Sequence, residues 1–121
     1  MRILFADDSA VTRTLVTPIL AAQGHEVAAA ENGTEAWDLW QSVHHPVVIA
    51  DWFMPGIDGL ELCRRIRADP HGGGTYFILQ TGRTADSMQA TESGVDQFLN
   101  KPIVPAELLA SVKAAAEALG L

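Results

Sequence analysis

Short apolar runs alternate with longer amphipathic stretches along the whole chain. Residues 3–5, 47–49 and 77–79 are apolar at every position, without the alternation of a half-exposed strand. Such runs are typical of strands that are buried on both faces of a parallel sheet. We predict strands at residues 2–6, 26–30, 47–50, 76–80 and 97–100.

The stretches between these runs carry helical patterns. We predict helices at residues 10–22, 34–44, 59–68, 85–93 and 105–119. In the last of these, Leu109, Val112, Ala116 and Leu119 recur at helical spacing and predict its buried side. Strands and helices that alternate at short intervals require right-handed crossovers and a parallel sheet covered by helices on both faces. The pattern therefore predicts an α/β fold, a doubly wound (βα)5 arrangement.

Length and composition place the chain among small globular domains. With 121 residues, 48% hydrophobic and 19% charged, we expect residues 1–121 to form one domain with a core of its own. The 15 acidic against 8 basic residues give a net charge of −7. We therefore expect no nucleic-acid partner, because phosphate contacts need a basic face.

Three further observations bear on the cellular compartment. No apolar run approaches the roughly 20 residues that span a bilayer, so we expect no membrane insertion. The first predicted strand begins almost at the N-terminus and leaves no room for a signal peptide. Cys63 is the single cysteine and cannot form an internal disulfide. Together these features indicate a reducing, cytoplasmic setting.

Polar residues follow four of the predicted strands at the point where each ends. They are Asp7 and Asp8 after the first strand, Asp51 after the third, Thr81 after the fourth and Lys101 after the fifth. Ligands of open α/β sheets bind at this edge, so we expect these side chains to converge. Three carboxylates held together repel one another, and a divalent cation relieves that repulsion. Oxygen ligands suit Mg²⁺, so the sequence predicts a magnesium site.

At these residues the chain resembles the receiver domain of two-component response regulators. The resemblance covers essentially the whole chain and is carried by the Asp7-Asp8 pair, by Asp51 with the Met-Pro-Gly that follows it, and by Thr81-Gly82 and Lys101-Pro102. It implies a flavodoxin-like fold with a five-stranded parallel sheet of order 2-1-3-4-5. It also implies Mg²⁺ as cofactor, and a sensor histidine kinase or histidine phosphotransfer protein as the phosphoryl donor.

The resemblance assigns a role to each matching position. Asp51 corresponds to the phosphoacceptor, Asp8 to a direct Mg²⁺ ligand and Asp7 to a residue that positions the ion. The backbone carbonyl of Phe53 corresponds to a further ligand, and Lys101 and Thr81 to groups that contact the phosphoryl group. Thr81 and Phe98 match a coupled pair that switches conformation on phosphorylation. Phe53 and Arg83 match positions that set the lifetime of the acyl phosphate, and the Lys101–Pro102 bond is expected to be cis.

Two other function classes remain open from the sequence. A magnesium-dependent phosphatase of the haloacid dehalogenase type also uses an aspartyl nucleophile, but it needs a second acid where Phe53 stands. A degenerate receiver would bind partners without phosphorylation. The complete acceptor set argues against a degenerate receiver, and Phe53 argues against the phosphatase. We therefore expect a signalling switch rather than an enzyme.

The remaining polar side chains offer no second site by their spacing. We expect His25, His44, His45 and His71 to lie on loops or helix ends without a shared face, because metal-ligand spacing is absent. We expect Arg64, Arg65 and Arg67 to lie at the solvated end of their helix.

Overall fold

A computed structural model describes residues 1–82, 90–91 and 93–121. Its elements are β1 (Arg2–Ala6), α1 (Ala10–Ala21), β2 (Glu26–Ala30), α2 (Gly33–Val43), β3 (Val47–Asp51), α3 (Gly59–Ala68), β4 (Tyr76–Thr81), β5 (Gln97–Asn100) and α5 (Pro105–Ala118). All five predicted strands are present, and β3 and β4 each run one residue further than predicted. The helix predicted at residues 85–93 falls mostly outside the described residues.

The five strands form one parallel sheet of order β2-β1-β3-β4-β5. This confirms the doubly wound fold and the strand order. In the centre, Phe5 pairs with Ile49, and Ile49 pairs with Ile78. Because the sheet is parallel, the carboxyl ends of all its strands lie along one edge.

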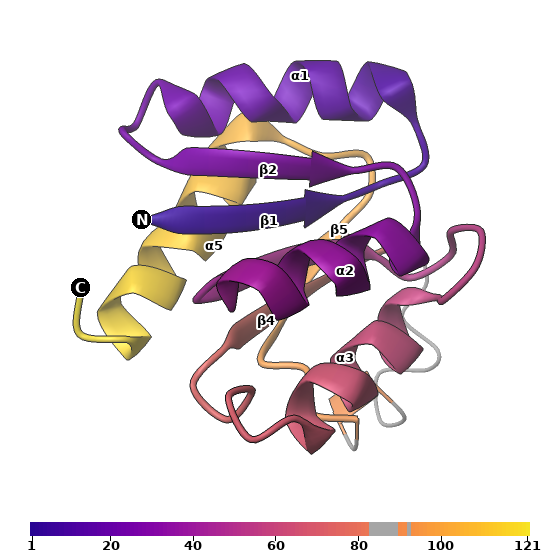
Figure 1. Cartoon of the computed structure of the whole chain (residues 1–121). Coiled ribbons are helices and arrows are strands. Elements are labelled where there is room, and N and C mark those ends of the chain that lie inside the picture. Colours follow the sequence, from indigo (N-terminus) through magenta and orange to yellow (C-terminus); the bar gives the residue numbers. More distant parts are fainter. Residues whose placement is uncertain (83–89, 92) are drawn as a thin grey trace.

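Helices cover both faces of the sheet (Figure 1). Val16 and Leu20 of α1 and Leu108 of α5 pack with one set of strand side chains, among them Ile3 and Phe5. On the other face the core is formed by α2 and α3 with the alternate strand side chains. Its largest fully buried side chain is Trp40. The alternation of strand side chains between two apolar layers explains why the central strands are apolar at every position.

The buried side of α5 differs from the prediction. Leu108, Val112 and Ala115 are buried, whereas Leu109 is only half-buried. The predicted stripe was right for Val112, and Leu109 and Leu119 pack against the core from half-buried positions. Its centre was misplaced because Leu108 and Leu109 are adjacent, so the sequence offers two apolar stripes about 100° apart. Ser111 lies within the buried side, where its hydroxyl Oγ accepts a hydrogen bond from Gln97 Nε2 at 3.0 Å.

Three of the helices begin at side-chain caps. Ser9 Oγ accepts the backbone N–H of Thr12 at 3.2 Å, and Asn32 Oδ1 accepts that of Glu35 at 2.8 Å. Asp58 Oδ1 caps α3 in the same way, 2.8 Å from the N–H of Glu61. These caps fix where α1, α2 and α3 begin at the carboxyl edge of the sheet, and each contributes about 1 kcal/mol.

The hydropathy of the helices and the environment of the single cysteine were both of interest from the sequence. Within the described part of the chain, no helix is long and apolar enough to cross a lipid bilayer. Cys63 is a free thiol buried in α3, where its Sγ lies 3.3 Å from the carbonyl oxygen of Ser93. Burial raises the pKa of this thiol to about 11, so the group stays protonated and is not a nucleophile at neutral pH.

Candidate functional site

Three carboxylates meet at the carboxyl edge of the sheet, as predicted. Asp51 is the last residue of β3, and Asp7 and Asp8 follow β1 directly. One oxygen from each of the three lies within 4.8 Å of the other two. Asp7 and Asp51 are buried, with 0% and 5% of their surface exposed, whereas Asp8 is exposed. Two of the three charges are therefore withdrawn from water, which magnifies their repulsion.

Lys101 brings a positive charge into contact with this cluster. Its Nζ donates a hydrogen bond to Asp51 Oδ2 and lies 3.9 Å from Asp7 Oδ2. Lys101 follows β5, as the sequence predicted, and the peptide bond between it and Pro102 is cis, which confirms that expectation. One ammonium group cannot neutralise three carboxylates, so the cluster keeps a negative balance.

The surroundings of Asp7 show that this negative charge is only partly compensated. Its Oδ1 accepts the backbone N–H of Ser9 at 2.9 Å, but its buried Oδ2 receives no hydrogen bond from any described residue. Burial raises the pKa of the Asp7 carboxyl, and the charges of Asp51 and Asp8 raise it further, against the opposing effects of Ser9 and Lys101. A buried carboxylate oxygen without a donor, facing two other carboxylates, fits a hard divalent cation such as Mg²⁺.

A pocket of about 440 Å³ opens beside these carboxylates. Its lining comprises Asp8, Asp51, Phe53, Thr81, Gly82 and Lys101. Thr81 is buried at the end of β4. Phe53 is 56% exposed, and its ring stacks on that of Trp52 with the centroids 5.7 Å apart. The residues predicted from four separate strand ends therefore line one cavity.

The backbone around Asp51 is fixed by the neighbouring elements. The N–H of Trp52 donates to the carbonyl of Gln80 at 3.0 Å, and the N–H of Gly59 donates to the carbonyl of Trp52 at 2.8 Å. A Cβ atom at Gly59 would lie 2.5 Å from the carbonyl oxygen of Asp51. Only glycine therefore lets α3 start so close to the end of β3, which holds the acidic residue at the mouth of the pocket.

The two remaining predicted residues are placed differently. Phe98, in β5, is half-buried and packs against the core layer beneath α2 and α3. Phe98 is not among the described residues that line the pocket. Arg83 lies outside the described residues.

Gln80 is a site neighbour without a predicted role. It is fully buried in β4 and lies opposite Asp51 in the strand register. Neither its Nε2 nor its Oε1 has a hydrogen-bond partner in the part of the chain that the structure describes. Side chains opposite each other on paired strands share a face of the sheet, so this amide lies beside the acidic cluster. One signal in the sequence could have drawn attention to Gln80: it is a polar residue directly after the apolar run at residues 77–79.

Comparison with known proteins agrees with this arrangement. The family of response regulator receiver domains matches residues 3–113. The response regulator RppA of Synechocystis sp. is 30% identical over 116 residues, covering 94% of this chain and 50% of that protein. A chemotaxis protein CheY homolog of Campylobacter jejuni is 37% identical over 109 residues, covering 87% of this chain and 84% of that protein. The chain spans about half the length of the first curated relatives it matches.

A solved structure shows the same fold. The chemotaxis response regulator CheY4 of Vibrio cholerae superposes with a TM-score of 0.89 at 29% sequence identity, covering 94% of this chain and 97% of that one. Receiver domains are signalling modules, and they interact with histidine kinases or phosphotransfer proteins. The match along almost the whole sequence, the strand order and the acidic edge of the sheet agree: this chain belongs to the response regulator receiver domains of two-component signal transduction.

Proposed function

We propose that this receiver domain accepts a phosphoryl group on Asp51 and then presents a changed surface to a partner protein. The observation that carries the proposal is the buried carboxylate of Asp51, in contact with Lys101 and flanked by Asp7 and Asp8 at the mouth of a pocket. We further propose that residues 1–121 act as one receiver domain in the cytoplasm. The donor is a sensor histidine kinase or a histidine phosphotransfer protein, with neither nucleic acid nor membrane as a direct ligand of this domain.

The transfer requires one bond to form and one to break. An oxygen of Asp51 attacks the phosphorus atom, the P–N bond of the donor phosphohistidine breaks, and its electron pair returns to the imidazole. The products are an aspartyl phosphate and a histidine. Such transfers pass through a loose transition state, so positioning and charge neutralisation supply most of the catalysis. No general base is needed, because the attacking group is a carboxylate and has no proton to give up.

The other residues neutralise charge and orient the phosphoryl group. Asp7, Asp8, Asp51 and the backbone carbonyl of Phe53 would hold Mg²⁺, which neutralises charge on the phosphoryl oxygens when it is bound. Lys101 Nζ exchanges its contact with Asp51 for one with a phosphoryl oxygen. The Thr81 hydroxyl donates to another, because it lines the same pocket.

We also propose how the site controls its signal. Movement of Thr81 toward the phosphoryl group makes room for Phe98 to turn inward, which alters the surface of β5 and α5. Phe53 covers one approach of water to the acyl phosphate. A phosphatase would need a second carboxylate at position 53, and this residue is Phe53.

Beryllofluoride, which binds a carboxylate as a mimic of its phosphoryl group, tests the switch. With Mg²⁺ present, we expect the amide NMR signals of Thr81, Phe98 and the start of α5 to shift in the wild type. The Asp51→Asn variant should show no such shifts, whereas the exposed control Asp38→Asn should behave as the wild type. Wild-type shifts confined to residues 51–54 would contradict a switch through Phe98. Shifts that persist in Asp51→Asn would contradict Asp51 as the acceptor.

A further inference from the structure

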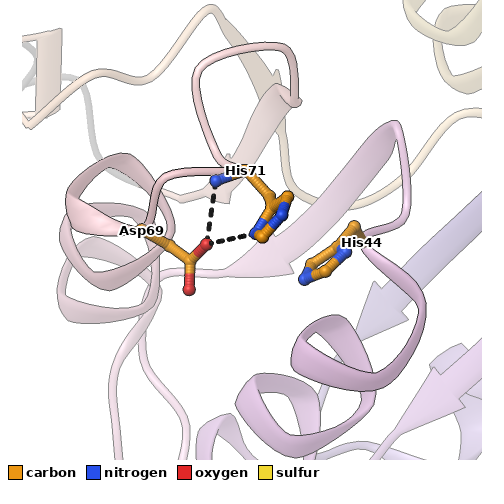
Figure 2. A group of neighbouring side chains, drawn as sticks. All are labelled: His44, Asp69 and His71. Atoms are coloured by element: carbon orange, nitrogen blue, oxygen red, sulfur yellow. Dashed lines mark hydrogen bonds and ion pairs between the residues drawn. The ribbon is translucent and has the colours of Figure 1, made fainter.

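The opposite edge of the sheet carries a second cluster of potential ligands. His44 ends α2 and lies just before β3, and Asp69 and His71 lie in the loop between α3 and β4. Figure 2 shows the three side chains turned toward one another from these two loops. The expectation that the histidines share no face is therefore wrong for His44 and His71. It failed because 26 residues separate them in the sequence and only the packing of α2 against α3 brings their loops together.

The three side chains form a compact group. The His71 ring lies 4.3 Å from the His44 ring between centroids, with 16° between their planes. Asp69 Oδ1 accepts the backbone N–H of His71 at 2.9 Å and lies 3.2 Å from the Nδ1 of the same residue. One ligand atom from each residue lies within 4.8 Å of the other two. The group thus brings two imidazole nitrogens and one carboxylate oxygen close together.

Hydrogen bonds fix the two loops relative to each other. Thr75 Oγ1 accepts the indole N–H of Trp40 at 3.3 Å and lies 3.3 Å from the carbonyl of His45, to which it donates. Arg67 Nη1 donates to the carbonyls of Gly72 and Thr75 at 2.8 and 2.6 Å. These contacts hold the backbones that carry His44 and His71, while both residues are exposed to solvent.

The donor set selects the class of ion. Imidazole with carboxylate suits Zn²⁺ and its transition-metal neighbours, whereas Mg²⁺ prefers oxygen ligands alone. The backbone N–H of His71 lowers the pKa of the Asp69 carboxyl, so this ligand is ionised at neutral pH. In a tetrahedral Zn²⁺ site neighbouring ligand atoms are about 3.3 Å apart, as bond lengths of about 2.0–2.1 Å require. Asp69 Oδ1 and His71 Nδ1 already stand at about that separation. A ligand atom of His44 lies within 4.8 Å of a ligand atom of each of them.

We propose that His44, Asp69 and His71 bind one divalent transition-metal ion of the Zn²⁺ type, with water completing the coordination. This site is distinct from the acidic pocket, because it lies at the amino ends of β3 and β4 and the pocket lies at their carboxyl ends. The hydrogen bond between Asp69 and His71 involves only one imidazole. A shared metal ion would also explain why the imidazole of His44, from the other loop, lies beside this pair.

Calorimetric titration with Zn²⁺ in saturating Mg²⁺ tests the proposal, because Mg²⁺ then occupies the acidic pocket. We expect one Zn²⁺ per chain, with affinity more than about tenfold weaker in His44→Asn and in His71→Asn. Asparagine suits position 44, whose φ of 54° lies in the left-handed region that asparagine tolerates. The matched control is His25→Asn, which should bind as the wild type because His25 contacts the N-terminal amine instead.

Each outcome decides the proposal once circular dichroism shows that the variants fold. Loss of binding in both loop variants, with binding kept in His25→Asn and in Asp8→Asn, supports it. No Zn²⁺ binding by the wild type overturns it. Unchanged binding in His44→Asn and His71→Asn, or loss of binding in Asp8→Asn alone, also overturns it, since the ion would then be held elsewhere.

Discussion

Asp7 is the residue at which the requirements of folding and of chemistry conflict most clearly. Its carboxylate is fully buried, one of its oxygens receives no hydrogen bond from the described residues, and two other acids stand beside it. In the ionised state such a group does not stabilise the folded domain. The arrangement becomes favourable when a cation is bound, so the cost of folding around Asp7 is linked to the function.

The Asp7→Asn variant tests this conflict in the absence of metal. Asparagine keeps an acceptor for the N–H of Ser9 and removes the charge, so we expect the free energy of unfolding at pH 7 to rise by about 1–3 kcal/mol. Urea unfolding in EDTA measures it. Addition of Mg²⁺ should reverse the order, because binding to the native state adds about 2.7 kcal/mol at a hundredfold excess over Kd.

The difference in free energy of unfolding between Asp7→Asn and the wild type should change with pH in one direction. The pKa of Asp7 is raised by folding above its ordinary value of 3.8, so the native state binds this proton more tightly than the unfolded state. The ionised group therefore destabilises the native wild type above the raised pKa, and protonation relieves the effect as the pH falls toward 3.8. The advantage of Asp7→Asn should shrink over that range. An advantage that is constant with pH would contradict a charge effect.

At the scale of the elements, Arg67 connects segments that the sequence leaves unrelated. It lies at the end of α3, where we expected a solvated side chain, but its side chain is only 23% exposed. The guanidinium donates to the carbonyl of Gly94 at 2.8 and 3.1 Å, and to those of Gly72 and Thr75. It also pairs with Asp96 Oδ2 at 2.7 Å. Arg67 thereby ties α3 to the loops before β4 and β5.

Replacement of Arg67 by methionine should lower the free energy of unfolding by about 2–3 kcal/mol, because several carbonyls and one carboxylate lose their donor. Arg64→Met is the matched control. Arg64 is exposed on the same helix and has a 3.8 Å contact with Glu61, so its loss should cost less than about 0.5 kcal/mol. Urea unfolding of both variants measures the difference. Equal effects would show that the Arg67 contacts add nothing to stability.

The elements also show what a sequence can predict here and what it cannot. The strands were predictable because their apolar runs fill two core layers, and Asp51, Thr81 and Lys101 were placed correctly because parallel strands end at one edge. The buried side of α5 was not, because the choice between Leu108 and Leu109 depends on the sheet it packs on. The contacts of Arg67 and the meeting of His44 with His71 were also missed, since both arise only when distant loops pack together.

At the scale of the whole molecule, the two edges of the sheet carry different chemistry. The carboxyl edge holds the oxygen-rich pocket of Asp8 and Asp51, and the amino edge holds the imidazoles of His44 and His71. Lys101 lies in the short segment between β5 and α5, close in sequence to Phe98. We propose that a change of partner at Lys101 acts on β5 and α5, the elements that would carry the altered surface.

The central claim is that Asp51 accepts the phosphoryl group, and peptide mapping by mass spectrometry tests it most directly. The protein is incubated with acetyl phosphate and Mg²⁺, and the phosphorylated residue is located in the wild type, in Asp51→Asn and in the control Asp38→Asn. We expect one phosphoryl group, on Asp51, in the wild type and the control, and none in Asp51→Asn or without Mg²⁺. Phosphorylation that persists in Asp51→Asn, or a wild type that remains unmodified, would contradict it.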